Sequence, residues 1–152
     1  MRIDELLQMP YWIIDIIPKQ VPKDSPGQYF SVEKHYLEKE RLAGIKQKHI
    51  NIILKINCYR DLVLYEDQET NPSPEQIADE MMKRSLFIMI DDAMILSEPE
   101  DTHLTVFNPS DQLLELIKEL AVGEGLFVWK PMLDKKVSRL NEKGIVDTTY
   151  ED

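Results

Sequence analysis

Glycine and cysteine are scarce in this sequence, and their scarcity excludes two common kinds of site. Only 5 of the 152 residues are glycine, so we expect none of the glycine-rich loops that hold phosphate groups. Gly123 and Gly125 follow a predicted helix, whereas a phosphate site needs glycines that open one. The single cysteine, Cys58, excludes a disulfide within these residues. Because free cysteines are usually buried, we interpret Cys58 as a small core residue.

Long apolar runs are missing as well. The two longest, residues 12–17 and 86–90, are far shorter than the roughly 20 residues that cross a bilayer. The N-terminal residues include two acids and lack the apolar stretch of a signal peptide. By elimination, the sequence favours a cytoplasmic protein without membrane contact. It contains no catalytic or cofactor-binding motif, so we expect no cofactor and favour a non-enzymatic role.

What is present is the pattern of a globular protein, with 43% hydrophobic and 30% charged residues. Runs of β-branched and aromatic residues predict strands at 11–17, 61–66, 86–90, 93–96, 103–107 and 126–129. Apolar residues at helical spacing predict helices over about 26–57, with a break near 38–44, over 74–82 and over 109–121. This order predicts an α+β fold, a mixed β-sheet of about five or six strands with three main helices packed on it.

One domain accounts for most of the chain. We expect residues 1–131 to form a single α+β domain and the polar residues 132–152 to be a marginal helix or disordered. Ser25, Ser73 and Asn108 each precede a proline and are predicted to cap the three helices. In the first helical region His49 falls on the apolar stripe and Lys46 lies off it. The aromatic residues of that region are expected to be core anchors: Tyr29, Phe30 and Tyr36.

The charge of the chain is strongly negative and unevenly spread. The formal net charge is −10. Residues 31–60 contain seven basic and three acidic residues, whereas residues 61–125 contain sixteen acidic and three basic residues. An acidic surface repels nucleic acid but attracts a basic protein, since complementary potentials speed and select encounters. The sequence therefore predicts a basic protein partner and makes nucleic acid an improbable one.

The densest polar cluster lies between residues 91 and 103. Its acids are predicted to bind the partner: Asp91, Asp92, Glu98, Glu100 and Asp101. Alternatively Asp91, Asp92 and His103 could bind a divalent metal, because carboxylates and imidazole are suitable ligands. The spacing matches no calcium-binding loop.

Asp15 interrupts an apolar strand and is either at a solvated edge or in a pocket, with the edge favoured. A buried carboxylate would need a partner, for which Lys19, Lys34 and His35 are nearest in sequence. A pocket acid with a raised pKa is a candidate general acid or base.

Three functional hypotheses follow. The first is a non-enzymatic interaction or regulatory protein of a prokaryotic cytosol, which binds a basic partner protein through its acidic surface. The second is a small metal-dependent hydrolase, with a site near Asp91, Asp92 and His103 or near Asp15. The third is a subunit of a larger assembly, in which residues 132–152 form a docking arm. Substrate, partner identity and oligomeric state do not follow from the sequence.

Overall fold

The structure, a computed structural model, describes residues 2–132. Its helices are α1 (Ile3–Leu6), α2 (Tyr29–Tyr36), α3 (Lys39–Asn57), α4 (Pro74–Lys83) and α5 (Asp111–Gly123). Its strands are β1 (Tyr11–Asp15), β2 (Val63–Leu64), β3 (Glu69–Thr70), β4 (Leu86–Ile90), β5 (Ala93–Ser97), β6 (Leu104–Phe107) and β7 (Phe127–Trp129). The predicted α+β class is confirmed. The hypothesis of a docking arm concerns residues 132–152, of which all but Met132 lie outside the described residues.

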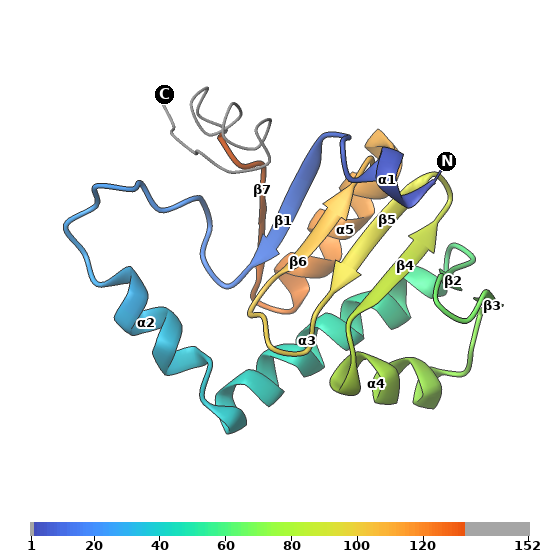
Figure 1. Cartoon of the computed structure of the whole chain (residues 1–152), viewed down its shortest axis with the longest axis horizontal. Helices are drawn as coiled ribbons and strands as arrows, with labels where there is room; N and C mark the ends of the chain where they lie inside the picture. Colours follow the sequence, from blue (N-terminus) through green and yellow to red (C-terminus); the bar gives the residue numbers. More distant parts are fainter. Residues whose placement is uncertain (1, 133–152) are drawn as a thin grey trace.

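All seven strands form one sheet in the order β3-β2-β4-β5-β6-β1-β7 (Figure 1). Every neighbouring pair is antiparallel, where the sequence predicted a mixed sheet of five or six strands. Topology explains the difference. Helix α5 links β6 and β7, which run in the same direction, but β1 lies between them and runs the opposite way. Helix α4 links β3 to β4 across β2 in the same manner.

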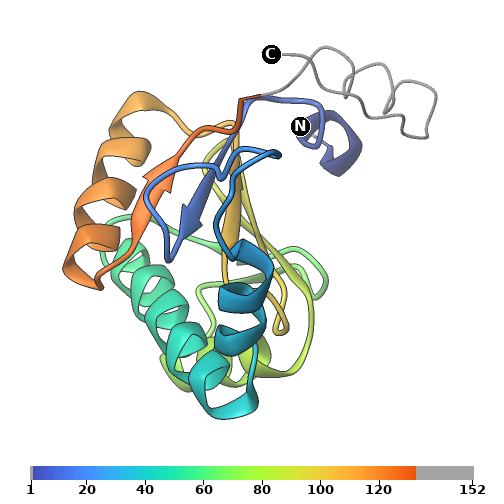
Figure 2. The same cartoon turned by 90° about the vertical axis from the view of Figure 1, so that its left-hand side faces the viewer.

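The sheet lies between two unequal layers (Figure 2). Helices α3, α4 and α5 cover one face and enclose the main core with it. The central strands contribute Ile88, Ile95 and Val106, and α3 contributes Ile53 and Ile56, all with no exposed surface. Each such side chain stabilises the fold by roughly 1.5–3 kcal/mol. These contacts fix α3 across the sheet and so position its side chains Lys46 and His49.

The opposite face of the sheet is covered only in part. There Leu6 of α1 packs on Met94 and Phe107 in a small second cluster. Neighbouring apolar side chains remain half-buried: Phe87, Met89 and Leu96. Within residues 2–132, no helix combines the length and the apolar character needed to cross a membrane.

Only one of the three predicted caps is where the sequence placed it. The Oγ of Ser73 caps α4 and accepts a hydrogen bond from the N–H of Gln76 at 3.1 Å. Helix α5 is instead capped by Ser110, two residues after Asn108. Helix α2 begins four residues after Ser25, which does not cap it. Residues with side-chain acceptors next to proline favour a chain reversal at more than one position, so they locate a helix start only approximately.

Helix α2 contains no buried residue and lies at the margin of the molecule (Figure 1). The prediction that its aromatics are core anchors was wrong: Phe30 is 81% exposed, and Tyr29 and Tyr36 are more than a third exposed. Cys58 is also exposed, not buried as expected. It follows the last residue of α3, beyond the buried stripe that ends at Ile56.

Candidate partner-binding cleft

The β4–β5 hairpin turns at two acidic residues. Its register pairs Ile90 with Ala93, which leaves Asp91 and Asp92 as a two-residue turn. Asp91 has a φ of 53°, in the left-handed region that such turns use and that aspartate tolerates. Both aspartates are exposed. The tight turn therefore presents two carboxylates at one end of the sheet.

Asn108 holds this turn against the start of α5. Its Nδ2 donates to the backbone carbonyl of Asp92 at 3.0 Å, and its backbone N–H donates to the carbonyl of Pro10 at 2.9 Å. Asn108 also has a positive φ, of 58°, which asparagine adopts more readily than most residues. Because this side chain is bound to the turn, Ser110 rather than Asn108 caps α5.

A cleft of about 550 Å³ lies between the β4–β5 turn and the beginning of α5. Most of its lining side chains are polar: Arg60, Asp91, Asp92, Asn108, Ser110 and Gln112. The one cation of this lining, Arg60, forms an ion pair with Asp91. The carboxylate of Asp92 has no ion pair within residues 2–132. Of the two carboxylates in the cleft, that of Asp91 is therefore paired and that of Asp92 is free within residues 2–132.

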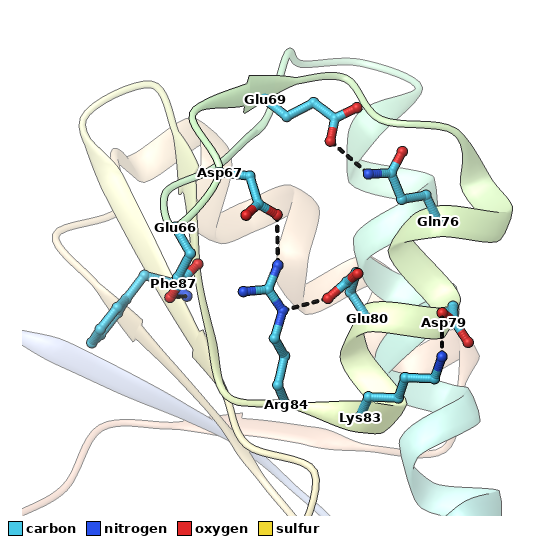
Figure 3. Close-up of polar contacts among 9 residues, drawn as sticks. All are labelled: Glu66, Asp67, Glu69, Gln76, Asp79, Glu80, Lys83, Arg84 and Phe87. Carbon is cyan, nitrogen blue, oxygen red and sulfur yellow. Dashed lines mark hydrogen bonds and ion pairs between the residues drawn. The ribbon is translucent and has the colours of Figure 1, made fainter.

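Around α4, the acidic half of the chain neutralises much of its own charge. Figure 3 shows Arg84 between two carboxylates, those of Asp67, at 2.5 Å, and of Glu80. Its neighbour Lys83 pairs with Asp79 at 2.9 Å. Two of the three basic residues between positions 61 and 125 are used in this way. The region around α4 therefore has less free charge to offer a partner than its sequence suggests.

Free acidic side chains follow the exposed side of α5 instead. Asp111, Glu115 and Glu119 are four residues apart, so they lie along one side of the helix. All three are exposed, and none forms an ion pair in the described part of the chain. This row begins next to Ser110, at the edge of the cleft.

The other acids predicted to bind a partner lie at the opposite end of β5. Glu98, Glu100 and Asp101 belong to the loop that joins β5 to β6. The carbonyl oxygen of Glu98 accepts a hydrogen bond from the Nζ of Lys46 at 2.8 Å. The charges of Asp101 and Glu98 act on the same lysine and favour its protonated form. The structure thus divides the predicted acidic surface between two ends of the hairpin.

The residues of the hypothetical metal site are divided in the same way. Asp91 and Asp92 precede β5, whereas His103 follows the loop at the far end of that strand. Five strand residues span about 17 Å. Among residues 2–132, no group of three or more His, Cys, Asp or Glu side chains is placed to hold a metal ion.

Asp15, at the end of β1, is buried, with 7% of its surface exposed. Burial raises the pKa of its carboxyl group, and this rise is opposed by a 2.7 Å hydrogen bond from the N–H of Ile16 and by the charge of His103. The indole of Trp129 also faces Asp15 and lowers its pKa, although its Nε1 makes no hydrogen bond of normal geometry. The favoured prediction of a solvated edge was therefore wrong, because β1 lies between β6 and β7 and Asp15 is buried there.

The groups around Asp15 are not those nearest in sequence. Lys19, Lys34 and His35 were expected, but the charges that act on its pKa are those of His103 and Glu33. Tyr29 of α2 lies on the same side, and burial together with Glu33 raises its pKa to about 12. Asp15 therefore lies near one member of the 91–103 cluster, His103.

Sequence reasoning missed two basic residues that are central to this region. Lys46 is 1% exposed, although it was placed off the apolar stripe. A signal was available, since Lys46 precedes His49 by three residues and Ile50 by four, which puts all three on one helix face. Arg60 gave no signal, because its partner Asp91 is 31 positions away and only the fold brings the two together.

Lys46 and Ser97 form the described pair closest in chemistry to a hydrolase site. The Nζ of Lys46 lies 3.5 Å from the Oγ of Ser97, and enzymes with a Ser–Lys pair activate serine in this manner. Burial lowers the pKa of Lys46 to about 8, a value suited to a base. However, Ser97 has no exposed surface and Lys46 only 1%, so a substrate has no access to either group.

Comparisons with protein-family models, with curated proteins and with solved structures found no match. The function has to be inferred from the residues and their arrangement.

Proposed function

We propose that this protein is a non-enzymatic interaction protein that binds a basic partner protein at the cleft between the β4–β5 turn and α5. The observation that carries this proposal is Asp92, an exposed carboxylate in a cleft of about 550 Å³ without an ion pair within residues 2–132. The neighbouring Asp91 already binds the guanidinium of Arg60, which supports an arginine side chain as the cation that this cleft accommodates.

The surroundings of the cleft favour a positively charged protein. The acidic row on α5, Asp111, Glu115 and Glu119, extends from its edge. A partner with several basic side chains would be steered along this row, and steering of this kind raises association rates chiefly at low salt. A nucleic acid would be repelled by the same charges.

A cytoplasmic location is part of the proposal. The thiol of Cys58 is exposed and unpaired with another cysteine. An exposed free thiol fits a reducing compartment, where thiols are kept from forming disulfides.

Binding of a fluorescent nona-arginine peptide, measured by anisotropy at low ionic strength, tests the proposal. Asp92→Asn should weaken binding about 5-fold, the effect of losing one ion pair worth about 1 kcal/mol. The matched control is Glu100→Gln, which removes the same charge from an exposed, unpaired acid at the other end of β5 and should change affinity less than about 2-fold. Equal losses in both variants, or no saturable binding by the wild-type protein, would contradict the proposal.

Arg60 provides an independent arm of the same experiment. It competes with the peptide for Asp91, so Arg60→Gln should strengthen binding by a similar factor of about 5. General attraction to a negative protein predicts a smaller gain, since this substitution changes the net charge by one unit in a total of −10.

A further inference from the structure

Two buried basic side chains of α3 pack against the β5–β6 loop. Lys46 and His49 are three residues apart on one helix face, and their exposed surfaces are 1% and 0%. The Nζ of Lys46 donates to the carbonyl oxygen of Glu98 at 2.8 Å and lies 3.5 Å from the Oγ of Ser97. Figure 1 shows α3 passing below the end of β5 and β6 where this loop turns. The loop is therefore bound to the helix through a buried cation.

The side chain of His49 lies in the same contact between α3 and the β5–β6 loop, but within residues 2–132 it makes no hydrogen bond there. Neither of its ring nitrogens has a hydrogen-bond partner among the described residues. The backbone of Thr102, in the loop, lies next to the ring and favours its protonated form, but not with the geometry of a hydrogen bond. Burying a neutral imidazole without hydrogen bonds costs free energy, and burying the charged imidazolium without a partner costs considerably more.

The charges around His49 add to this cost. Lys46 faces it from its own helix and His103 from the loop, and both oppose a positive charge on the ring. The loop carboxylates of Asp101 and Glu98 act on Lys46 instead. The charge of His103 also acts on the carboxyl group of Asp15, from β1, and opposes the rise of its pKa. Burial, followed by these two charges, lowers the pKa of His49 to about 3.

We propose that His49 is a pH-sensitive lock, whose protonation releases the β5–β6 loop from α3. In the closed state the ring is neutral and completely buried between the helix and the loop. An opened loop lets water reach the ring, which then binds a proton with its ordinary affinity. The released loop carries Glu98 and Asp101, whose charges act on Lys46 in the closed state, so acidification separates these two carboxylates from that cation.

The direction of the pH effect follows from linkage. Because the pKa of His49 is lowered in the closed state, the open state binds more protons below about pH 6.5. The closed state of the loop is therefore most stable, relative to the open state, above that pH. Its stability decreases progressively as the pH falls toward 3. At pH 5 the opening equilibrium should be about 30-fold more favourable than at pH 8.

Hydrogen exchange of the full chain, followed by mass spectrometry at pH 8 and pH 5, tests this lock. After correction for the intrinsic exchange rate, the protection of the amides of residues 97–103 should fall about 30-fold at pH 5 in the wild-type protein. His49→Phe keeps a ring of similar shape but cannot bind a proton, and its loop should keep its protection at both pH values. His49→Gln, polar and also without a titration in this range, serves if the Phe variant does not fold.

The matched control is His35→Gln, which removes an exposed histidine of α2 and should respond to pH as the wild-type protein does. Loop protection that is insensitive to pH in the wild-type protein would overturn the proposal. An equal loss of protection in the His49 variants would also overturn it, because another group would then drive the opening.

Discussion

The two ends of strand β5 use the same residue types in opposite ways. At the β4–β5 turn, Asp91, Asp92 and Arg60 are charged groups that reach solvent, and one carboxylate is left free. At the β5–β6 loop, Lys46 and His49 are enclosed, and the charge of Lys46 is bound to the loop. At the β4–β5 turn, a cation of another molecule can replace Arg60 at Asp91. At the β5–β6 loop, the contact of Lys46 is buried and is lost only when the loop leaves α3.

This difference shows that exposure, and not the density of charge in the sequence, separates recognition from stability. An exposed ion pair is worth about 0–1 kcal/mol and can be replaced by a partner's side chain. A buried cation without its acceptor is far more costly, which makes the contact structural and sensitive to protonation. Substitutions at the two ends should therefore differ most in the free energy of unfolding.

The largest effect is expected for Lys46→Ala at the buried end. The substitution removes a long buried side chain and leaves the carbonyl oxygen of Glu98 without its donor. We expect a loss of about 3 kcal/mol in the free energy of unfolding, measured by urea denaturation at pH 7. Lys46→Met is the control that keeps the apolar stem, and it should lose about half as much. A loss below about 1 kcal/mol in both variants would mean that the loop is not bound through this lysine.

An intermediate effect of opposite sign is expected for Asp15→Asn. Burial raises the pKa of Asp15, so the folded state disfavours its charge above that pKa and the penalty disappears below the unfolded value near 4. The neutral amide avoids the penalty and can still accept the hydrogen bond from Ile16. We expect the variant to be about 1 kcal/mol more stable than the wild-type protein at pH 7 and equally stable at pH 3. Urea denaturation at both pH values measures this, and a less stable variant at pH 7 would show that the charge of His103 outweighs burial.

Much of this architecture was predictable, because local patterns determine it. The strands at 86–90, 93–96 and 103–107 were found close to their observed bounds, since each is a short β-branched or apolar run flanked by polar residues. The antiparallel sheet was not predictable, because the insertion of β1 between β6 and β7 pairs residues about 100 positions apart. The exposure of helix α2 was not predictable for a related reason, since apolar residues at helical spacing do not indicate which face, if any, the fold covers.

The candidate site was predictable in composition but not in arrangement. The sequence identified Asp91, Asp92 and Asp101 as partner-binding candidates, and they lie within eleven residues of one another in the chain. In the fold, however, the first two lie at one end of β5 and Asp101 lies at the other. Only the pairing of β5 with its neighbours separates them. Arg60 was missed because its partner Asp91 is 31 positions away in the chain. The position of Lys46 on the face of His49 was readable from the sequence, but its contact with the carbonyl of Glu98, 52 positions away, was not.

The smallest effect on stability is expected for Arg60→Gln at the exposed end. The guanidinium pairs with Asp91, but the aspartate side chain is 55% exposed, so water replaces most of what the pair contributes. We expect a loss below about 1 kcal/mol in the urea series used for Lys46→Ala, and a difference from the wild-type protein that shrinks as salt is added. The same variant should bind nona-arginine more tightly, so stability and affinity would change in opposite directions at this end alone. A loss as large as that of Lys46→Ala would make Arg60 a structural cation and remove the contrast between the two ends of β5.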